Sequence, residues 1–251
     1  MRIGLIGAGN MASALARGWN EPLLVFDVQP ERARALADEV GGEALGSNAE
    51  VAERADAVVL CHKPAQLEQV AAEIGERASA VVSILGGVQL ADVEAAYPGK
   101  PVYRVMPNIS AEVRQGVFCY VAGTHAGEGP EAEVRALFER LGTVIDLPEA
   151  QMEPATALMS CGTAFFSLVG EALTDAGVRH GLQPPEAARM VVETMGGAAA
   201  VLRESEHDMR ELRSRVTSPG GLTERGVSVL EAAGLRAAFD DAVDAVVTPP
   251  K

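Results

Sequence analysis

Two hydropathy patterns divide the chain near residue 148. Before that point, short continuous apolar runs alternate with longer amphipathic stretches. A short continuous apolar run is typical of a strand buried on both faces, as in a parallel sheet. Strands that alternate with helices predict an open, mostly parallel sheet. The predicted strands are residues 3–6, 23–26, 57–60, 80–85, 102–106, 117–121 and 143–147.

The stretches between these runs carry apolar residues at helical spacing. Gly41-Gly42 follows one of them and ends it, because glycine readily adopts the left-handed conformation that closes a helix. The helices predicted in this part of the chain are residues 11–19, 30–40, 50–54, 66–77 and 131–141.

Beyond Pro148-Glu149 only helical periodicity remains. The sequence there is rich in Ala, Leu and Met, and Pro184-Pro185 interrupts its first long helix. Helices are predicted at 151–180, from 185 or 186 to 204, and at 208–216, 223–233 and 235–247. The pattern therefore predicts an N-terminal α/β domain, residues 1–149, and a C-terminal all-helical domain, residues 150–251.

A glycine-rich turn follows the first predicted strand. Gly7 and Gly9 stand where a tight turn and close approach of the backbone to a phosphate are needed. Ala12 is small enough for the next helix to pack on the strand, and the N-terminus of that helix is positively polarised. The unit predicts a Rossmann-type domain that binds NAD(P)H. The cofactor-binding residues expected in the turn are Gly7, Ala8, Gly9, Asn10 and Met11.

Asp27 ends the second predicted strand, 18 positions after Gly9. A carboxylate near this spacing normally accepts hydrogen bonds from the adenine ribose hydroxyls. It would also repel a 2′-phosphate, so we expect NADH to be preferred or at least tolerated, although Arg32 lies close by. The alternative is that Asp27 merely caps the next helix.

Two further groups of residues follow predicted strands and so lie at the same edge of the sheet. The first is His62-Lys63-Pro64, in which Lys63 can reach cofactor phosphate or ribose. The second is Met106-Pro107-Asn108, a stiff turn that places an amide near the nicotinamide. Both groups are candidate cofactor contacts. The alternatives are an exposed loop lysine and an Asn108 side chain that bonds the backbone.

Composition narrows the class of protein. The net charge of −14 disfavours nucleic acid as a partner. The four His and three scattered Cys form no cluster, so no metal site is expected, and the thiols suit a reducing cytoplasm. No run of 18 apolar residues is present and the N-terminus reads as a strand, so neither a membrane span nor a signal peptide is expected.

Several motifs together resemble the pyrroline-5-carboxylate reductase family, nearly from end to end. The Arg-x-Met-Pro-Asn and Ser-Pro-Gly-Gly-x-Thr pair is the most specific, since a dinucleotide fold alone predicts neither. The matching segments are residues 7–12, Lys63-Pro64, 104–108, 171–178 with Gly181-Leu182, and 216–223.

The resemblance implies hydride transfer from NAD(P)H to the cyclic imine 1-pyrroline-5-carboxylate, which gives L-proline. It implies that Thr223 bonds the ring nitrogen and that Glu206 occupies an acidic position of the family. Backbone N–H groups of the turn would hold the substrate carboxylate. The expected substrate-binding residues are Ser218, Pro219, Gly220, Gly221 and Thr223. The alternatives are an ordinary helix connection for the turn and a solvated helix cap for Glu206.

The sequence departs from the family pattern in one segment and at single positions, which include His62, Arg215 and Leu222. The family's Gly-Ser-Gly-Pro-Ala-Tyr stretch reads Ser160-Cys161-Gly162-Thr163-Ala164-Phe165 here, which leaves room for a related imine reductase or a non-catalytic nucleotide-binding sensor. A hydroxyacid dehydrogenase would need a lysine on a helix of the second domain. Residues 151–248 contain no Lys, which argues against it.

The predicted helices of the second domain carry apolar residues on more than one face. A domain of this size buries too little of its own surface to cover them. We therefore expect at least a homodimer, and the family resemblance implies subunits that interleave this domain, with a decamer as one form. The residues that carry this expectation include Leu158, Met159, Phe165, Phe166, Leu168 and Val169.

Overall fold

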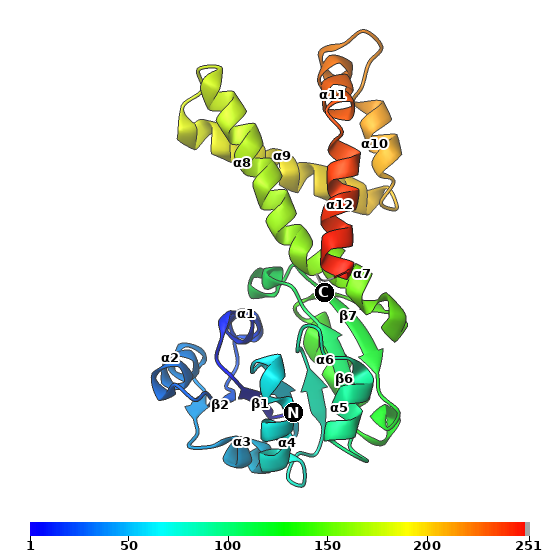
Figure 1. Cartoon of the computed structure of the whole chain (residues 1–251). Coiled ribbons are helices and arrows are strands. Elements are labelled where there is room, and N and C mark those ends of the chain that lie inside the picture. The colour runs from blue at the N-terminus through cyan, green and yellow to red at the C-terminus, as the bar shows by residue number, and fades with distance from the viewer. Residues whose placement is uncertain (249–251) are drawn as a thin grey trace. The chain divides into compact units, whose positions relative to one another are not determined.

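The computed structural model describes residues 1–248 and forms two compact units, Met1–Ser160 and Cys161–Lys251 (Figure 1). The first unit holds a sheet of eight strands in the order β3-β2-β1-β4-β5-β6-β7-β8. Its strands are β1 Ile3–Ile6, β2 Leu24–Phe26, β3 Glu43–Ala44, β4 Ala57–Leu60, β5 Val81–Ser83, β6 Val102–Met106, β7 Gly116–Ala122 and β8 Gly142–Asp146.

The first six α-helices of the first unit lie between these strands, and the seventh, α7, follows β8. They are α1 Asn10–Trp19, α2 Pro30–Val40, α3 Asn48–Arg54, α4 Leu67–Ile74, α5 Leu90–Ala96, α6 Glu131–Glu139 and α7 Met152–Thr156. The strand order reverses at β1, which pairs with β2 on one side and β4 on the other. In open parallel sheets a ligand binds in the crevice beyond such a reversal. The topology therefore places the cofactor cleft at the carboxyl ends of β1 and β4.

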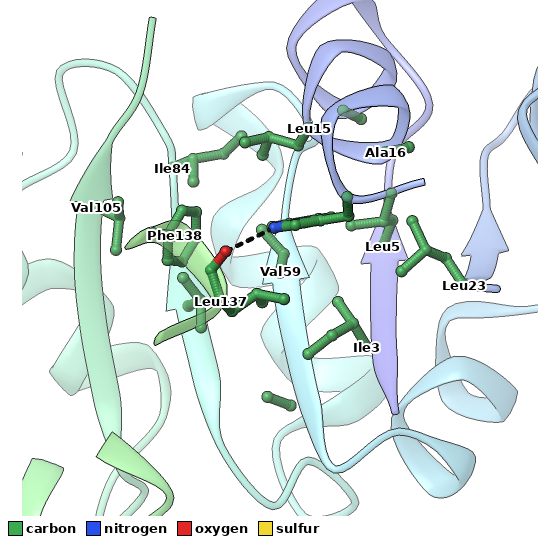
Figure 2. Close-up of a cluster of buried hydrophobic side chains, with 14 of the residues drawn as sticks. Ile3, Leu5, Leu15, Ala16, Leu23, Val59, Ile84, Val105, Leu137 and Phe138 are labelled. Carbon is green, nitrogen blue, oxygen red and sulfur yellow. Dashed lines mark hydrogen bonds between the residues drawn. The ribbon is translucent and has the colours of Figure 1, made fainter. Parts of the chain in front are cut away.

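The core beneath this cleft is a cluster of buried hydrophobic side chains. Figure 2 shows Leu5 and Val59 on neighbouring strands, with Leu15 of α1 above them. The indole N–H of Trp19 donates to the carbonyl of Leu137 at 2.9 Å, so the one polar atom of this buried ring has a partner. The bond ties α1 to α6 and thus fixes the helix that follows the glycine turn.

The strand pattern identified the sheet but missed some of its detail. β7 runs antiparallel to β6, because only a short connection joins them. The two-residue edge strand β3 and helix α5 were not predicted, since Glu43–Ala44 is too short to show a pattern and Leu90–Ala96 spans only two turns. β5 is confined to Val81–Ser83, shorter than the apolar run that contains it.

A buried arginine ties the end of the first unit to the sheet. The side chain of Arg104 in β6 is only 2% exposed, and its guanidinium pairs with Glu149 and, at 3.2 Å, with Glu153. The same Glu149 oxygen accepts from the Leu90 N–H at 2.9 Å. The Arg of the Arg-x-Met-Pro-Asn motif therefore anchors the segment that leads into α7.

The second unit is helical throughout its described residues. Its helices are α8 Gly162–Arg179, α9 Pro184–Glu204, α10 Met209–Arg215, α11 Leu222–Ala232 and α12 Leu235–Val247. A π-helical segment, Ala157–Cys161, joins α7 to α8, so the single helix predicted at 151–180 is two α-helices with a wider turn between them.

Almost nothing in this unit is buried within the chain itself. Only Gly162 and Ala187 are buried among its described residues, while Phe166 is 64% and Val192 67% exposed. By length and composition alone, Glu149–Arg179 is apolar enough to cross a membrane, although no continuous run of apolar residues suggested one, and 11% of its apolar window is buried. This surface needs a cover that the chain does not provide.

Candidate active site

The glycine turn after β1 has the geometry that a phosphate cradle needs. Gly7 has φ +103°, and a Cβ there would lie 2.7 Å from the Cys61 carbonyl oxygen, so only glycine fits. A Cβ at Gly9 would meet nothing within 4 Å, which means that the space beside Gly9 is open. The turn is therefore closed on its protein side and open on its ligand side.

Helix α1 begins at this turn with its donors unused. Gly9 is the N-cap and supplies no side chain to the free N–H groups of the first turn. These N–H groups and the helix dipole together favour an anion. The residues at this end, Asn10 and Met11, fit the pyrophosphate of a dinucleotide.

Asp27 is held beside the turn by two backbone hydrogen bonds. Its Oδ2 accepts from the Ala8 N–H at 2.7 Å, and its Oδ1 accepts from the Gln29 N–H at 2.8 Å. Each carboxylate oxygen has a second lone pair, so Asp27 can still accept from hydroxyl groups. It is thus a fixed acceptor at the end of β2, and it also forms a local turn with Gln29.

A cavity of about 960 Å³ brings most of the predicted cofactor residues together. Gly7, Gly9, Asn10, Met11, Asp27, His62, Lys63 and Pro64 all line it, and Ala8 lines an adjoining hollow with Arg32. The sequence did not point to several other residues of its lining, because one lies within strand β2 and the others lie on helices α3 and α4, outside any motif. These residues include Phe26, Asn48, Gln69, Val70 and Glu73.

Two unpartnered polar atoms mark this cleft. The buried Oδ1 of Asn48 has no hydrogen-bond partner in the described chain, whereas its amide group donates to Glu73 at 2.7 Å. The Nε2 of His62 also lacks a partner. Buried polar atoms are normally satisfied, so both are candidates for contact with a bound molecule.

The histidine's protonation state follows from its neighbour. Its Nδ1 lies 2.9 Å from the Lys63 carbonyl, which can only accept, so Nδ1 carries the proton and Nε2 is an acceptor. Burial lowers the pKa of His62, and the bond to the Lys63 carbonyl opposes this only in part. Burial also raises the pKa of the adjacent Cys61 thiol, which is therefore no nucleophile at neutral pH.

The Met106-Pro107-Asn108 segment lies at the end of β6 and does not line this cavity. The Asn108 side chain is engaged on both sides: its Nδ2 donates to the Met159 carbonyl at 2.9 Å, and its Oδ1 accepts from the Val117 N–H at 3.1 Å. This is the backbone-bonding role that the sequence left open for Asn108. Any contact of its side chain with a cofactor would have to compete with these bonds.

The turn of the helical unit connects α10 to α11. Gly220 has φ +73°, and the Gly221 N–H donates to the Ser218 carbonyl at 2.9 Å. Ser218, Pro219 and Thr223 are exposed, and no side chain caps the first turn of α11, which begins at Leu222. The turn therefore presents helix N–H groups beside the Thr223 hydroxyl, a suitable set for a carboxylate next to a polar atom.

Glu206 lies in a strained loop between α9 and α10. Glu206 and His207 both adopt left-handed backbone conformations, with φ +53° and +65°. Such conformations cost a non-glycine residue on the order of 1–3 kcal/mol and are concentrated at functional sites. The His207 N–H donates to the Leu202 carbonyl at 2.9 Å, as in a Schellman motif, so the left-handed conformation at Glu206 closes the end of α9. This is the helix-cap role that the sequence left open for Glu206.

The two units match two family models. A model of the coenzyme F420-dependent NADP oxidoreductases matches residues 2–87, and one for pyrroline-5-carboxylate reductase dimerisation matches residues 149–249. The Mycobacterium tuberculosis pyrroline-5-carboxylate reductase is 36% identical over 97% of this chain and 94% of its own length. The Pseudomonas aeruginosa enzyme is 35% identical over 97% and 93%.

Solved structures agree with these matches. A pyrroline-5-carboxylate reductase from Coxiella burnetii superposes with a TM-score of 0.87 at 31% identity, covering 98% of this chain and 96% of that one. The Plasmodium falciparum pyrroline carboxylate reductase, solved with NADP bound, gives a TM-score of 0.89 at 28% identity over 98% and 95%.

A dinucleotide cleft in an α/β unit, followed by a helical dimerisation domain, defines an NAD(P)H-dependent oxidoreductase. Relatives of this class reduce quite different substrates, so the family is settled by the near full-length matches. The chain belongs to the pyrroline-5-carboxylate reductase family. This confirms the predicted fold class, the NAD(P)H cofactor and the predicted activity in proline biosynthesis. The dimerisation domain also explains the exposed apolar helices, since a second subunit can cover them.

Proposed function

We propose that this chain reduces 1-pyrroline-5-carboxylate with the division of labour that its two units indicate. The first unit holds the cofactor, and the helical unit holds the substrate. The observation that carries this assignment is the pairing of an open phosphate cradle at Gly7 and Gly9 with an exposed Thr223 hydroxyl beside the free N–H groups of α11.

The residues fit a dinucleotide, and bound NAD(P)H supplies the hydride. The iminium carbon of the substrate accepts this hydride with its electron pair, the C=N double bond becomes single, and the ring nitrogen becomes the amine of L-proline. The protonated imine is already electrophilic, so the protein need only orient it. In this proposal Thr223 bonds the ring nitrogen, and the carboxylate is held by the turn of Ser218, Pro219, Gly220 and Gly221.

Glu206 is assigned to the same substrate site. A carboxylate beside the protonated imine stabilises its positive charge, since opposite charges attract. The acidic position that Glu206 shares with the family supports the assignment, whereas its left-handed backbone belongs to the cap that ends α9.

In the cofactor cleft we assign the pyrophosphate to residues 7–11, with Lys63 as a nearby cation and Pro64 fixing its turn. His62 offers its neutral Nε2 to a cofactor hydroxyl. Met106, Pro107 and the backbone of Asn108 are assigned to the border of the nicotinamide, because the Asn108 amide is engaged elsewhere.

We also propose that NADH is preferred over NADPH. Asp27 is fixed by two N–H groups and would repel a 2′-phosphate, whereas Arg32, which also lines the cleft, would attract one. We expect the repulsion of the 2′-phosphate by Asp27 to outweigh its attraction to Arg32, because two backbone hydrogen bonds hold the Asp27 carboxylate in place. The expected result is a higher kcat/KM for NADH, and a ratio that shifts about tenfold toward NADPH in Asp27→Ser. A severalfold advantage for NADPH in the unchanged protein contradicts this assignment.

The assembly is proposed to be a homodimer or a larger ring of dimers, including a decamer, in the cytoplasm. The unpaired Cys61, Cys119 and Cys161 suit a reducing compartment. The proposed domain boundary lies between residues 149 and 150, where the dimerisation family match begins, although the compact units divide after Ser160.

The test of the activity is oxidation of NADH and NADPH with 1-pyrroline-5-carboxylate, alongside a six-membered cyclic imine acid. We expect turnover with the five-membered ring and conversion to L-proline. Turnover only with the six-membered ring indicates a related imine reductase. Cofactor binding without turnover of either substrate indicates a sensor.

A further inference from the structure

The carboxylate of Glu224 already occupies an N–H group of the proposed substrate turn. Its Oε2 accepts from the Gly220 N–H at 2.6 Å, a short charge-assisted bond. Glu224 is the third residue of α11 and is exposed, so no packing forces it into this position. A carboxylate of the chain's own sequence thus lies where the carboxylate of the substrate is expected.

We propose that Glu224 is a resident carboxylate that substrate and product must displace from this turn, an inference that rests on the proposed function. Two carboxylates cannot share the Gly220 N–H, and like charges this close repel each other. The Gly221 N–H is already bonded to the Ser218 carbonyl, so the turn has no spare glycine donor to offer instead.

The consequence is a selective weakening of carboxylate binding. A substrate that bears a carboxylate binds less tightly than it would to a turn not occupied by Glu224. The same holds for L-proline, which bears the same group. When product leaves, Glu224 returns to Gly220, which favours release over rebinding. A cyclic imine without a carboxylate does not compete with Glu224.

The experiment compares Glu224→Ala with the unchanged protein on two substrates. One is 1-pyrroline-5-carboxylate, and the other is 1-pyrroline, the same ring without the carboxylate. We expect the KM for 1-pyrroline-5-carboxylate and the inhibition constant of L-proline each to fall about tenfold, the scale of one hydrogen bond to a charged group. The KM for 1-pyrroline stays unchanged. The thermal shift produced by L-proline increases as a second readout.

Glu186→Ala is the matched control. Glu186 is an exposed acid in the first turn of α9, within the same unit, and no hydrogen bond from it to a turn is present in the described chain. The Glu186→Ala substitution removes the same favourable helix-end charge without touching the turn. A change in Tm common to both variants therefore reports that charge, while KM falls only in Glu224→Ala. Equal KM and inhibition constants in Glu224→Ala and the unchanged protein overturn the proposal and leave Glu224 a simple cap.

Glu224→Gln decides the matter if the alanine variant does not fold. It keeps the side-chain length and the acceptor but removes the charge, so intermediate values support the proposal and unchanged values overturn it. Failure of the proposed function gives a different result. If the unchanged protein shows equal kcat/KM for the two imines, the turn does not recognise a carboxylate at all.

Discussion

The cofactor unit and the helical unit differ most in how they bury apolar side chains. In the cofactor unit, Leu5 and Val59 are fully buried within the chain. In the helical unit, Phe166 and Val192 remain about two-thirds exposed. A folded monomer rarely leaves so much apolar surface open. The first unit therefore has its own core, whereas the second leaves apolar surface that a partner subunit can cover.

The same contrast extends to the chemistry. In the cofactor unit the proposed phosphate cradle is defined by backbone shape, above all at Gly7 and Gly9, where side chains are excluded or absent. The helical unit offers two exposed polar groups, Thr223 in the first turn of α11 and Glu206 in the connection between α9 and α10. Substitutions in the two units should consequently separate cofactor affinity from turnover.

The largest effect is expected from a charge on the exposed apolar face. Phe166→Glu should prevent dimerisation, because burying an unpaired carboxylate in an apolar interface costs several kcal/mol, on the order of 3–5. Activity at sub-micromolar concentration should then be lost, while NADH still binds. Light scattering after size exclusion, with activity measured on the same fractions, gives the answer.

Val113→Glu is the control for this change. Val113 is 69% exposed in the cofactor unit, so a charge there remains in water. If Phe166→Glu yields a fully active species at the monomer mass of 26.2 kDa, the dependence of the helical unit on a partner is refuted.

Thr223→Ala should separate turnover from cofactor binding. Loss of one transition-state hydrogen bond is expected to lower kcat/KM for the imine by about 2–4 kcal/mol, roughly 30- to 1000-fold. The Kd for NADH, measured by fluorescence, should not change. Thr217→Ala is the control, because the Thr217 hydroxyl is already bonded to the Arg213 carbonyl at 2.6 Å. An unchanged kcat/KM in Thr223→Ala removes this residue from the mechanism.

The two glycines of the cradle should respond differently to alanine. Gly7→Ala places a Cβ against the Cys61 carbonyl at a left-handed φ, so we expect a loss of about 1–3 kcal/mol in the free energy of unfolding. Gly9→Ala meets no protein atom and should keep its stability, but its methyl group fills the space proposed for pyrophosphate. Chemical denaturation and NADH titration distinguish the two. Equal loss of stability in both variants would contradict the distinction.

The smallest effect is expected from His62→Val as a function of pH. The pKa of His62 is lowered by burial, so between that value and the ordinary value near 6.5 the unfolded chain binds more protons than the folded one. Stability from a neutral His62 is therefore complete above about pH 7 and declines as the pH falls below 6.5. The difference in unfolding free energy between the two proteins should shrink on going from about pH 7.5 to 5.5. A constant difference would show that His62 titrates normally.

Local sequence patterns were enough to find the cleft residues that lie in the turns directly after strands. The motif at Gly7 and the ends of β1, β2 and β4 could be placed because a parallel sheet brings its strand ends to one edge. Asn48 and Glu73 could not be found in this way, since they come from α3 and α4 and meet only when those helices pack side by side. Likewise, Asn108 sits in a readable motif, but its bonds to Met159 and Val117 span distant positions in the chain.

The sequence alone indicated most of the order of strands and helices, the two-part organisation, the family, and the positions that we propose for the cofactor turn and the substrate turn. These features can be read from the hydropathy period, the placement of glycine and proline, and the spacing of motifs. All of these signals come from residues that are close together in the sequence. Only the tertiary structure decided that Arg104 anchors Glu149 and Glu153, that β7 reverses direction beside β6, and that Glu224 bonds the Gly220 N–H. Each of these features depends on contacts between residues that folding brings together. Burial and hydrogen bonding in the folded chain decide which of those contacts form.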